Sequence, residues 1–163
     1  MSKPVRGEPM PEGNAPPGVR RLREGDFDRW LALWRGYLSF YRAEVTDEVT
    51  RASFERLRGA DRGMVGLVAV DGNDRLLGLA HLVFHPATWS VTDYCYLEDL
   101  YVDPQQRGGR VAHVLFEAVY ATARERGVGH VYWHTQQYNG AARSLYDQVG
   151  QPTSFVVYQH DLA

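Results

Sequence analysis

The segment of residues 98–112 constrains the fold more than any other part of this 163-residue chain. An apolar, strand-like run leads to Pro104, then to a basic loop that contains Gly108 and Gly109, and then to a helical pattern. The first N–H groups of a helix lack partners within it and lie at the positive end of its dipole, and glycine lets the backbone approach a ligand. This order of elements therefore predicts a phosphate cradle, with the acidic residues of the strand toward the other end of the same ligand.

The helix after the loop is predicted by its spacing. Apolar residues recur at helical intervals from Val111 to Thr122, and Gly127 and Gly129 end the pattern. Glycine-bearing turns before helices also occur without any ligand. The strand, loop and helix alone therefore do not establish phosphate binding.

Two further segments add to this motif. Residues 130–135 alternate and are rich in β-branched and aromatic side chains, which is typical of a strand. Asn139 is a good N-cap for a short helix that carries Leu145 and Tyr146 and ends at Gly150.

In this order and spacing, the motifs resemble those of the GNAT superfamily of N-acetyltransferases, which transfer an acetyl group from acetyl-CoA to an amine. Residues 107–112 resemble the Arg/Gln-x-x-Gly-x-Gly/Ala loop of the family, and residues 139–146 its Asn-x-x-Ala-x-x-Leu-Tyr helix. Residues 97–99 resemble the acidic strand end of polyamine and aminosugar acetyltransferases. The resemblance spans roughly residues 18–160 and is greatest for the branch with yeast histone, polyamine and D-amino-acid acetyltransferases.

The resemblance implies that acetyl-CoA is the cofactor. The residues that it assigns to CoA binding are the strand end, the loop with the start of its helix, and the second helix cap: Leu100, Tyr101, Val102, Arg107, Gly108, Gly109, Arg110, Val111, Ala112 and Asn139. One position departs from the family pattern, because Arg110 stands where the loop usually has glycine. Its side chain would either pair with a phosphate of CoA or crowd the pyrophosphate.

Acetyl transfer to an amine requires a base and an acid. An alkylammonium with a pKa of about 10.4 must lose a proton before it attacks a thioester, and a carboxylate can relay that proton through water. Glu98 is the first candidate and Asp99 the second, and an alternating strand would turn them to opposite sides unless a bulge intervenes. The resemblance implies that Glu98 faces the substrate and that Tyr146 protonates the leaving thiolate. The thioester oxygen needs a donor as charge builds on it, and a backbone N–H near Leu100 could serve. In the alternative interpretation the carboxylates are ordinary edge residues and Tyr146 is a core tyrosine.

The acceptor side offers aromatic candidates, which could bind a cationic amine or could pack in the core. They are Tyr37, Tyr41, His85, Trp89 and Trp133. For Trp30 and Trp34 on the first predicted helix, core packing is the better interpretation. His81 and His85 share a strand face but lack partners at metal-ligand spacing, so no metal site is predicted.

Composition limits the class of partner and the compartment. The formal net charge of −2 and the lack of a basic patch argue against nucleic acid as a partner. A lone cysteine, Cys95, suits a reducing compartment, and no apolar stretch approaches the ~18 residues of a membrane span. The N-terminus also lacks the apolar core of a signal peptide, so we expect a cytoplasmic protein that is not membrane-bound. The partner is expected to be a small-molecule amine, and the family branch favours a homodimer.

The pattern predicts a mixed α/β fold with a mostly antiparallel central sheet flanked by helices. Residues 1–17, rich in Pro and Gly, are predicted to be a disordered tail, and residues 18–163 a single acetyltransferase domain. Strands are expected at 19–22, 64–70, 76–84, 94–102, 130–135 and 154–161, with a hairpin turn at 71–74. Helices are expected from Asp26 to about Arg42, from Thr46 or Asp47 to about Leu57, and at the two motifs above.

Three functions are compatible with these patterns. The first is an active N-acetyltransferase for small amines, or alternatively for protein amines. The second is a CoA-binding regulatory protein without turnover, for which Arg110 would be the reason. The third is a structural α/β domain in which Gly108 and Gly109 form only a turn.

Overall fold

The computed structural model describes residues 16–162, so almost all of the predicted tail, residues 1–17, lies outside the described part. The chain forms two compact units that divide between Trp133 and His134. Within residues 16–162, none of the helices is both long enough and apolar enough to cross a membrane.

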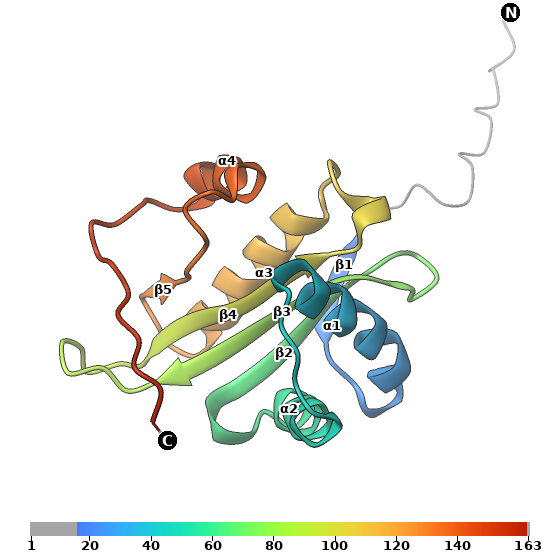
Figure 1. The fold of residues 1–163 in the computed structure, drawn as a ribbon, viewed down its shortest axis with the longest axis horizontal. Coiled ribbons are helices and arrows are strands. Elements are labelled where there is room, and N and C mark those ends of the chain that lie inside the picture. Colours follow the sequence, from blue (N-terminus) through green and yellow to red (C-terminus); the bar gives the residue numbers. More distant parts are fainter. Residues whose placement is uncertain (1–15, 163) are drawn as a thin grey trace, which may run out of the picture. The chain divides into compact units, whose positions relative to one another are not determined.

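The first unit contains a five-stranded sheet and three helices (Figure 1). Its elements are, in chain order, β1 Gly18–Arg21, α1 Phe27–Tyr41, α2 Asp47–Gly59, β2 Met64–Val70, β3 Leu76–His85, β4 Tyr94–Val102, α3 Val111–Glu125 and β5 Val131–Tyr132. Short 3₁₀ turns lie at Glu24–Asp26, Asp61–Gly63 and Pro104–Gln106. The predicted mixed α/β fold is confirmed, and the bounds of β2 and β4 are those predicted.

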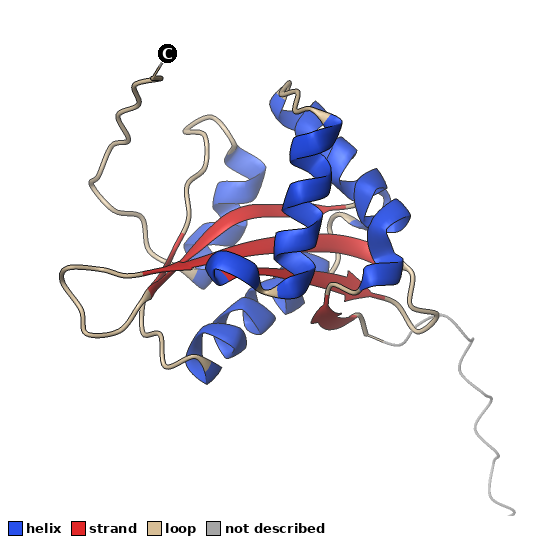
Figure 2. Cartoon of the chain, turned by 90° about the horizontal axis from the view of Figure 1, so that it is seen from below, coloured by secondary structure: helices blue, strands red, loops and turns tan. Residues whose placement is uncertain are grey.

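The sheet order is β1-β2-β3-β4-β5. Strands β1 to β4 form an antiparallel meander, and β5 lies parallel to β4, joined to it by the crossover helix α3. Helices cover both faces of the sheet (Figure 2). The predicted strand at 130–135 is shorter than expected, because only Val131 and Tyr132 pair with β4.

The alternation of side chains along β3 shows which helices cover which face of the sheet. The indole of Trp30, on α1, donates to His81, and a Cβ added at the neighbouring Gly66 would touch Leu57 of α2. Gly78, three residues from His81, faces the other way, and a Cβ there would touch Val111 and Leu115 of α3. Helices α1 and α2 therefore cover one face and α3 the other.

The core between α1, α2 and the sheet is strongly aromatic. Trp30 and Trp34 are both buried and stack with ring centroids 5.7 Å apart, and Phe54 of α2 packs on Trp30 at 5.2 Å. The core interpretation of these two tryptophans is confirmed.

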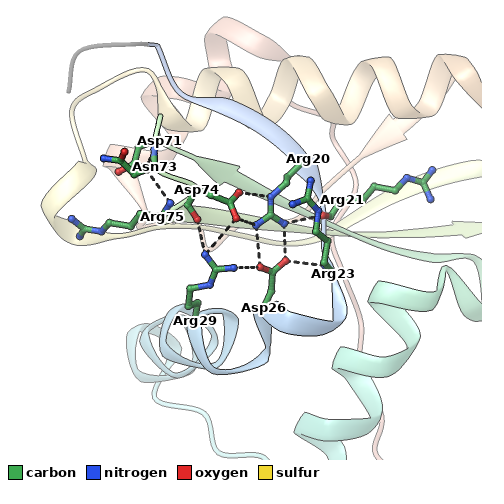
Figure 3. Close-up of polar contacts among 9 residues, drawn as sticks. All are labelled: Arg20, Arg21, Arg23, Asp26, Arg29, Asp71, Asn73, Asp74 and Arg75. Carbon is green, nitrogen blue, oxygen red and sulfur yellow. Dashed lines mark hydrogen bonds and ion pairs between the residues drawn. The ribbon is translucent and has the colours of Figure 1, made fainter. Parts of the chain in front are cut away.

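An ion-pair cluster anchors the edge of this core (Figure 3). Asp26 occupies the predicted N-cap position of α1, but its buried carboxylate does not cap the helix. It accepts instead from the guanidinium of Arg20 at 2.7 and 3.0 Å, from Arg29 at 2.5 Å and from the N–H of Arg23 at 2.8 Å. Arg20 also donates to Asp74 in the β2–β3 turn, so one guanidinium links β1, the start of α1 and the hairpin. Helix α2 begins at Asp47, one of the two predicted starts, and the Thr46 hydroxyl caps it by accepting from the N–H of Val49.

The second unit contains α4, Gly140–Val149, followed by an extended segment. The predicted strand at 154–161 is wrong, because residues 151–162 form neither strand nor helix. The alternation of β-branched and aromatic residues favours a strand, yet a strand forms only where a neighbouring edge takes its hydrogen bonds. The apolar side chains of this segment, Phe155, Val156, Val157, Tyr158 and Leu162, are largely exposed.

Candidate active site

The site is built around an irregularity in β4. His81 of β3 pairs with Asp99, but the next residue, Leu82, pairs with Leu97, so Glu98 is an extra residue without a partner on β3. This is a β-bulge, which bends the strand and redirects its side chains. The strict alternation that would turn Glu98 and Asp99 to opposite sides is therefore interrupted between them.

Asp99 lies at the end of a hydrogen-bonded chain of side chains. Its carboxylate is 2.8 Å from Nδ1 of His81, and Nε2 of the same ring is 2.9 Å from the indole nitrogen of Trp30. His81 is 2% exposed and Trp30 is fully buried. Three elements, α1, β3 and β4, thus contribute one residue each to this chain.

Burial and charge perturb the groups beside Asp99. Burial, followed by the charge of Asp99 and a hydrogen bond to it, raises the pKa of Tyr37 far above its usual range. The side chain of Glu98 is exposed, although the protein around its carboxyl group removes part of the water that would stabilise its charge. This desolvation raises the pKa of Glu98, and the charge of Asp99 raises it further. A carboxyl group with a raised pKa is a better proton acceptor near neutral pH than an ordinary glutamate.

In the described part of the chain, the outer edge of β4 has no strand paired with it beside these residues. Strand β5 pairs only with Cys95 and Tyr96, and within residues 16–162 no other strand pairs with this edge beyond Tyr96. On its inner edge β4 pairs with β3 at every residue from Asp99 to Val102, with Leu100 opposite Ala80 and Val102 opposite Gly78. The predicted cofactor-binding stretch 100–102 therefore has a rigid inner edge and an outer edge at which backbone groups can pair with an extended ligand.

The loop after β4 has the backbone of a cradle. Asp103 caps a 3₁₀ turn by accepting from the N–H of Gln105, and Gly108 follows with φ at +78°. A Cβ added at Gly108 would meet no atom within 4 Å, so this glycine is needed for its backbone conformation and leaves open space above the loop. The side chain of Arg107 lies against the end of β4, with its guanidinium 5.6 Å from the ring centroid of Tyr101.

Arg110 fits this loop without backbone strain. It is the N-cap residue of α3 with φ −84° and ψ −3°, a helical conformation that any residue adopts, and its side chain is exposed. The N–H groups of Val111 and Ala112 open the helix after it, and this is where a helix binds anions. The departure from the family pattern therefore falls at a position where glycine is not required, since the positive φ is at Gly108.

The aromatic acceptor candidates do not all come together. Tyr37 and Tyr41 lie side by side on α1, with centroids 4.9 Å apart, on the face of the sheet that carries Asp99. His85 is held by the Tyr132 hydroxyl at 2.8 Å, and Trp89 is 88% exposed in the β3–β4 connection. Trp133 packs on Phe116 of α3. Only the two α1 tyrosines are therefore grouped beside the carboxylates.

The two remaining candidates lie in the second unit. Asn139 is the N-cap residue of α4, but its side chain does not bond to the helix and donates to the Thr135 hydroxyl at 3.3 Å. Tyr146 is half-buried on α4. Their predicted roles, cofactor contact and general acid, stay predictions.

Comparison with known proteins identifies the family. A sequence model of the acetyltransferase (GNAT) family matches residues 30–151. The chain belongs to this family. It is 33% identical over 144 residues to the D-amino-acid N-acetyltransferase HPA3 of Saccharomyces cerevisiae, covering 88% of this chain and 89% of that protein. It is 30% identical over 89 residues to the thialysine N-ε-acetyltransferase of Caenorhabditis elegans, covering 55% of this chain and 54% of the relative.

Solved structures of the family have the same fold. A probable acetyltransferase superimposes with a TM-score of 0.77 at 24% identity, over 89% of this chain and 97% of that one. The aminoglycoside acetyltransferase AAC(6′)-Iy, solved with a bisubstrate analogue of CoA and acetylneamine, gives a TM-score of 0.78 at 17% identity, over 91% and 100% of the two chains. As a GNAT acetyltransferase, the chain is an acetyl-transfer enzyme that uses acetyl-CoA. Within residues 16–162 no group of three or more His, Cys, Asp or Glu is arranged to hold a metal ion.

The structure adds two residues that sequence reasoning did not place in the site. From the sequence His81 was considered as a metal ligand, and Trp30 was expected to fill the core, yet the two form a hydrogen-bonded chain with Asp99. In the β3–β4 hairpin Val102 pairs with Gly78, and counting three residues from this pair places Asp99 opposite His81. The pairing shifts by one residue at the bulge, and no feature of the sequence marks the position of this bulge.

Proposed function

We propose that the protein is an N-acetyltransferase that transfers the acetyl group of acetyl-CoA to a primary amine of a small molecule by direct attack. The observation that carries this proposal is the bulge in β4, which takes Glu98, a glutamate with a raised pKa, out of the pairing with β3 directly beside Asp99. The relatives support an amine acceptor, since they are named for D-amino acids and thialysine.

The proposed binding of acetyl-CoA uses the strand edge and the loop. Its thioester supplies the acetyl group, and its pyrophosphate would bind to the N–H groups that open α3, over the free space at Gly108. The backbone from Leu100 to Val102 would pair with the pantetheine arm, and Arg107 and Arg110 would supply positive charge near the phosphates.

The proposed chemistry divides its proton transfers between two residues. Glu98 accepts the proton of the ammonium through a water molecule, while Asp99 remains a fixed negative charge that attracts the ammonium. Tyr146 is proposed as the acid that protonates the departing thiolate, and a backbone N–H near Leu100 as the oxyanion donor. Tyr37 and Tyr41 would line the acceptor side, and an ammonium is attracted to the faces of such rings.

The assembly and the compartment are also proposals. The exposed apolar segment 155–162 supports a homodimer, because burying such side chains is favourable. A cytoplasmic location is supported by the single, unpaired cysteine.

The first test is the melting temperature with and without excess acetyl-CoA. At 100 times its dissociation constant a ligand adds about 2.7 kcal/mol, which raises the melting temperature by roughly 5–10 °C for a domain of this size. Release of the CoA thiol with a panel of D-amino acids, L-amino acids, diamines and lysine peptides then identifies the acceptor class. Binding without thiol release for any amine would favour a regulatory CoA-binding protein, and no binding at millimolar acetyl-CoA would refute the cradle.

A further inference from the structure

The chain of Trp30, His81 and Asp99 has a fixed direction. An indole nitrogen can only donate, so at 2.9 Å the Nε2 atom of His81 must be the acceptor and carry no hydrogen. The hydrogen of the neutral imidazole is then on Nδ1, and it donates to the Asp99 carboxylate at 2.8 Å. Trp30 therefore selects the tautomer of His81 that holds Asp99.

Packing alone does not account for this bond. Trp34 lies one turn along the same helix, stacks on Trp30 and approaches the same imidazole, with ring centroids 5.5 Å apart. It is 8% exposed, yet its indole N–H has no hydrogen-bond partner within the described residues, while that of Trp30 is aimed at Nε2. Two similar indoles thus fill the same core, and only one is joined to the acidic site.

We propose that Trp30 and His81 are positioning residues for acetyl transfer, which orient the Asp99 carboxylate so that it binds the ammonium group of the acceptor beside Glu98. One carboxylate oxygen is engaged by the imidazole, and the remaining lone pairs of Asp99 are available to the ammonium and to Tyr37. This inference rests on the proposed function, because the amine is the ligand that Asp99 would orient. The tautomer of His81 with hydrogen on Nδ1 follows from the hydrogen bonds alone and can be measured without substrate.

The matched pair Trp30→Phe and Trp34→Phe tests the proposal in the full-length enzyme. Trp30→Phe removes the N–H that fixes the tautomer, and we expect the KM for the amine to rise about tenfold, with kcat and the KM for acetyl-CoA nearly unchanged. Trp34→Phe makes the same change in volume at an N–H without a partner, and we expect amine KM to stay within about twofold. Equal values of amine KM in the two variants would overturn the proposal.

Two variants of His81 separate positioning from packing. Asparagine can donate from its amide to Asp99 in place of Nδ1, so His81→Asn is expected to retain most of the affinity for the amine. His81→Leu leaves Asp99 without this donor, and we expect the amine KM to rise roughly 10- to 100-fold. If both variants lose activity equally at a temperature where both are folded, His81 acts only in packing and the proposal fails.

Nitrogen NMR of the His81 ring provides a readout that does not depend on turnover. We expect the wild-type protein and Trp34→Phe to carry the hydrogen on Nδ1, and Trp30→Phe to show a mixture of tautomers. Hydrogen on Nε2 in the wild type would overturn the inference even in an active enzyme. A wild type without acetyl transfer but with hydrogen on Nδ1 would instead contradict the proposed function alone.

Discussion

The buried carboxylate of Asp26 gives a sharp test of how this fold is held together. Its side chain is 1% exposed, and the guanidinium of Arg20 joins it to Asp74, whose side chain is 46% exposed. One cation thus bonds a buried and an exposed carboxylate at the same distance of 2.7 Å (Figure 3). Asp26→Asn and Asp74→Asn are therefore a matched pair that differ in burial.

The expected magnitude follows from that difference. Removing one partner of a buried ion pair costs about 3–5 kcal/mol, and we expect about 3 kcal/mol for Asp26→Asn, the low end, since Asp74 still pairs with Arg20. Each kcal/mol lowers the melting temperature by about 2–4 °C in a domain of this size, which gives a fall of roughly 6–12 °C. Ion pairs of exposed carboxylates contribute little, so Asp74→Asn should lower it by less than about 2 °C.

The pH dependence supplies a second measurement. Burial tends to raise the pKa of Asp26, but its bonds to Arg20 and to the Arg23 N–H outweigh this, so the pKa is lowered. A lowered pKa in the folded state means that the stabilisation is present above the usual value of about 4 and is lost as the pH falls through the folded value. Thermal unfolding followed by circular dichroism from pH 7 to pH 2 should therefore show wild type and Asp26→Asn converging at low pH. Equal losses for the two variants at pH 7, or curves that stay parallel, would refute the reasoning.

Three more predictions concern the site and its surroundings. A Cβ added at Gly36 of α1 would lie 2.5 Å from the Tyr101 hydroxyl, whereas one at Gly59 meets nothing within 4 Å. Gly36→Ala should therefore melt roughly 3–10 °C below Gly59→Ala, and equal melting temperatures would show that Tyr101 moves aside without cost. Glu98→Gln should lower kcat at least about 100-fold. Because the pKa of Glu98 is raised, its ionised form opposes folding. The melting temperature of the same variant should therefore exceed that of the wild type at pH 7, and the difference should vanish below about pH 4. Burial raises the pKa of the Cys95 thiol to about 11, so it should not react with a disulfide reagent at pH 8 until the protein is denatured, and rapid labelling of the native protein would contradict this burial.

The helices and the central strands follow from local patterns that the sequence displays. The apolar run at residues 64–70 and the apolar and aromatic residues at 94–102 predict β2 and β4 to the residue. Both strands lie in the interior of the sheet, where the two faces are covered and both sets of side chains tend to be apolar. Gly127 marks the end of α3, and it has the positive φ expected after a helix.

The errors lie where the structure depends on distant partners. Residues 154–161 have the composition of a strand, but composition does not supply the edge that a strand must pair with. The carboxylate of Asp26 is a good helix cap by local rules, and two arginines outcompete the helix for it. Sequence patterns report the local preference, and a partner far along the chain overrides it.

The chemistry of the site depends on one such non-local feature. Glu98 and Asp99 are neighbours of nearly equal intrinsic acidity, and nothing in their order says which accepts a proton. The bulge separates them: Asp99 keeps its place opposite His81 and receives its hydrogen bond, while Glu98 leaves the pairing and comes under the repulsion of that fixed charge. Two carboxyl groups whose environments differ in this way are suited to different tasks, one as an anion that binds the ammonium and the other as the base. An extra residue in the strand, rather than either side chain by itself, is therefore the feature that assigns their proposed roles.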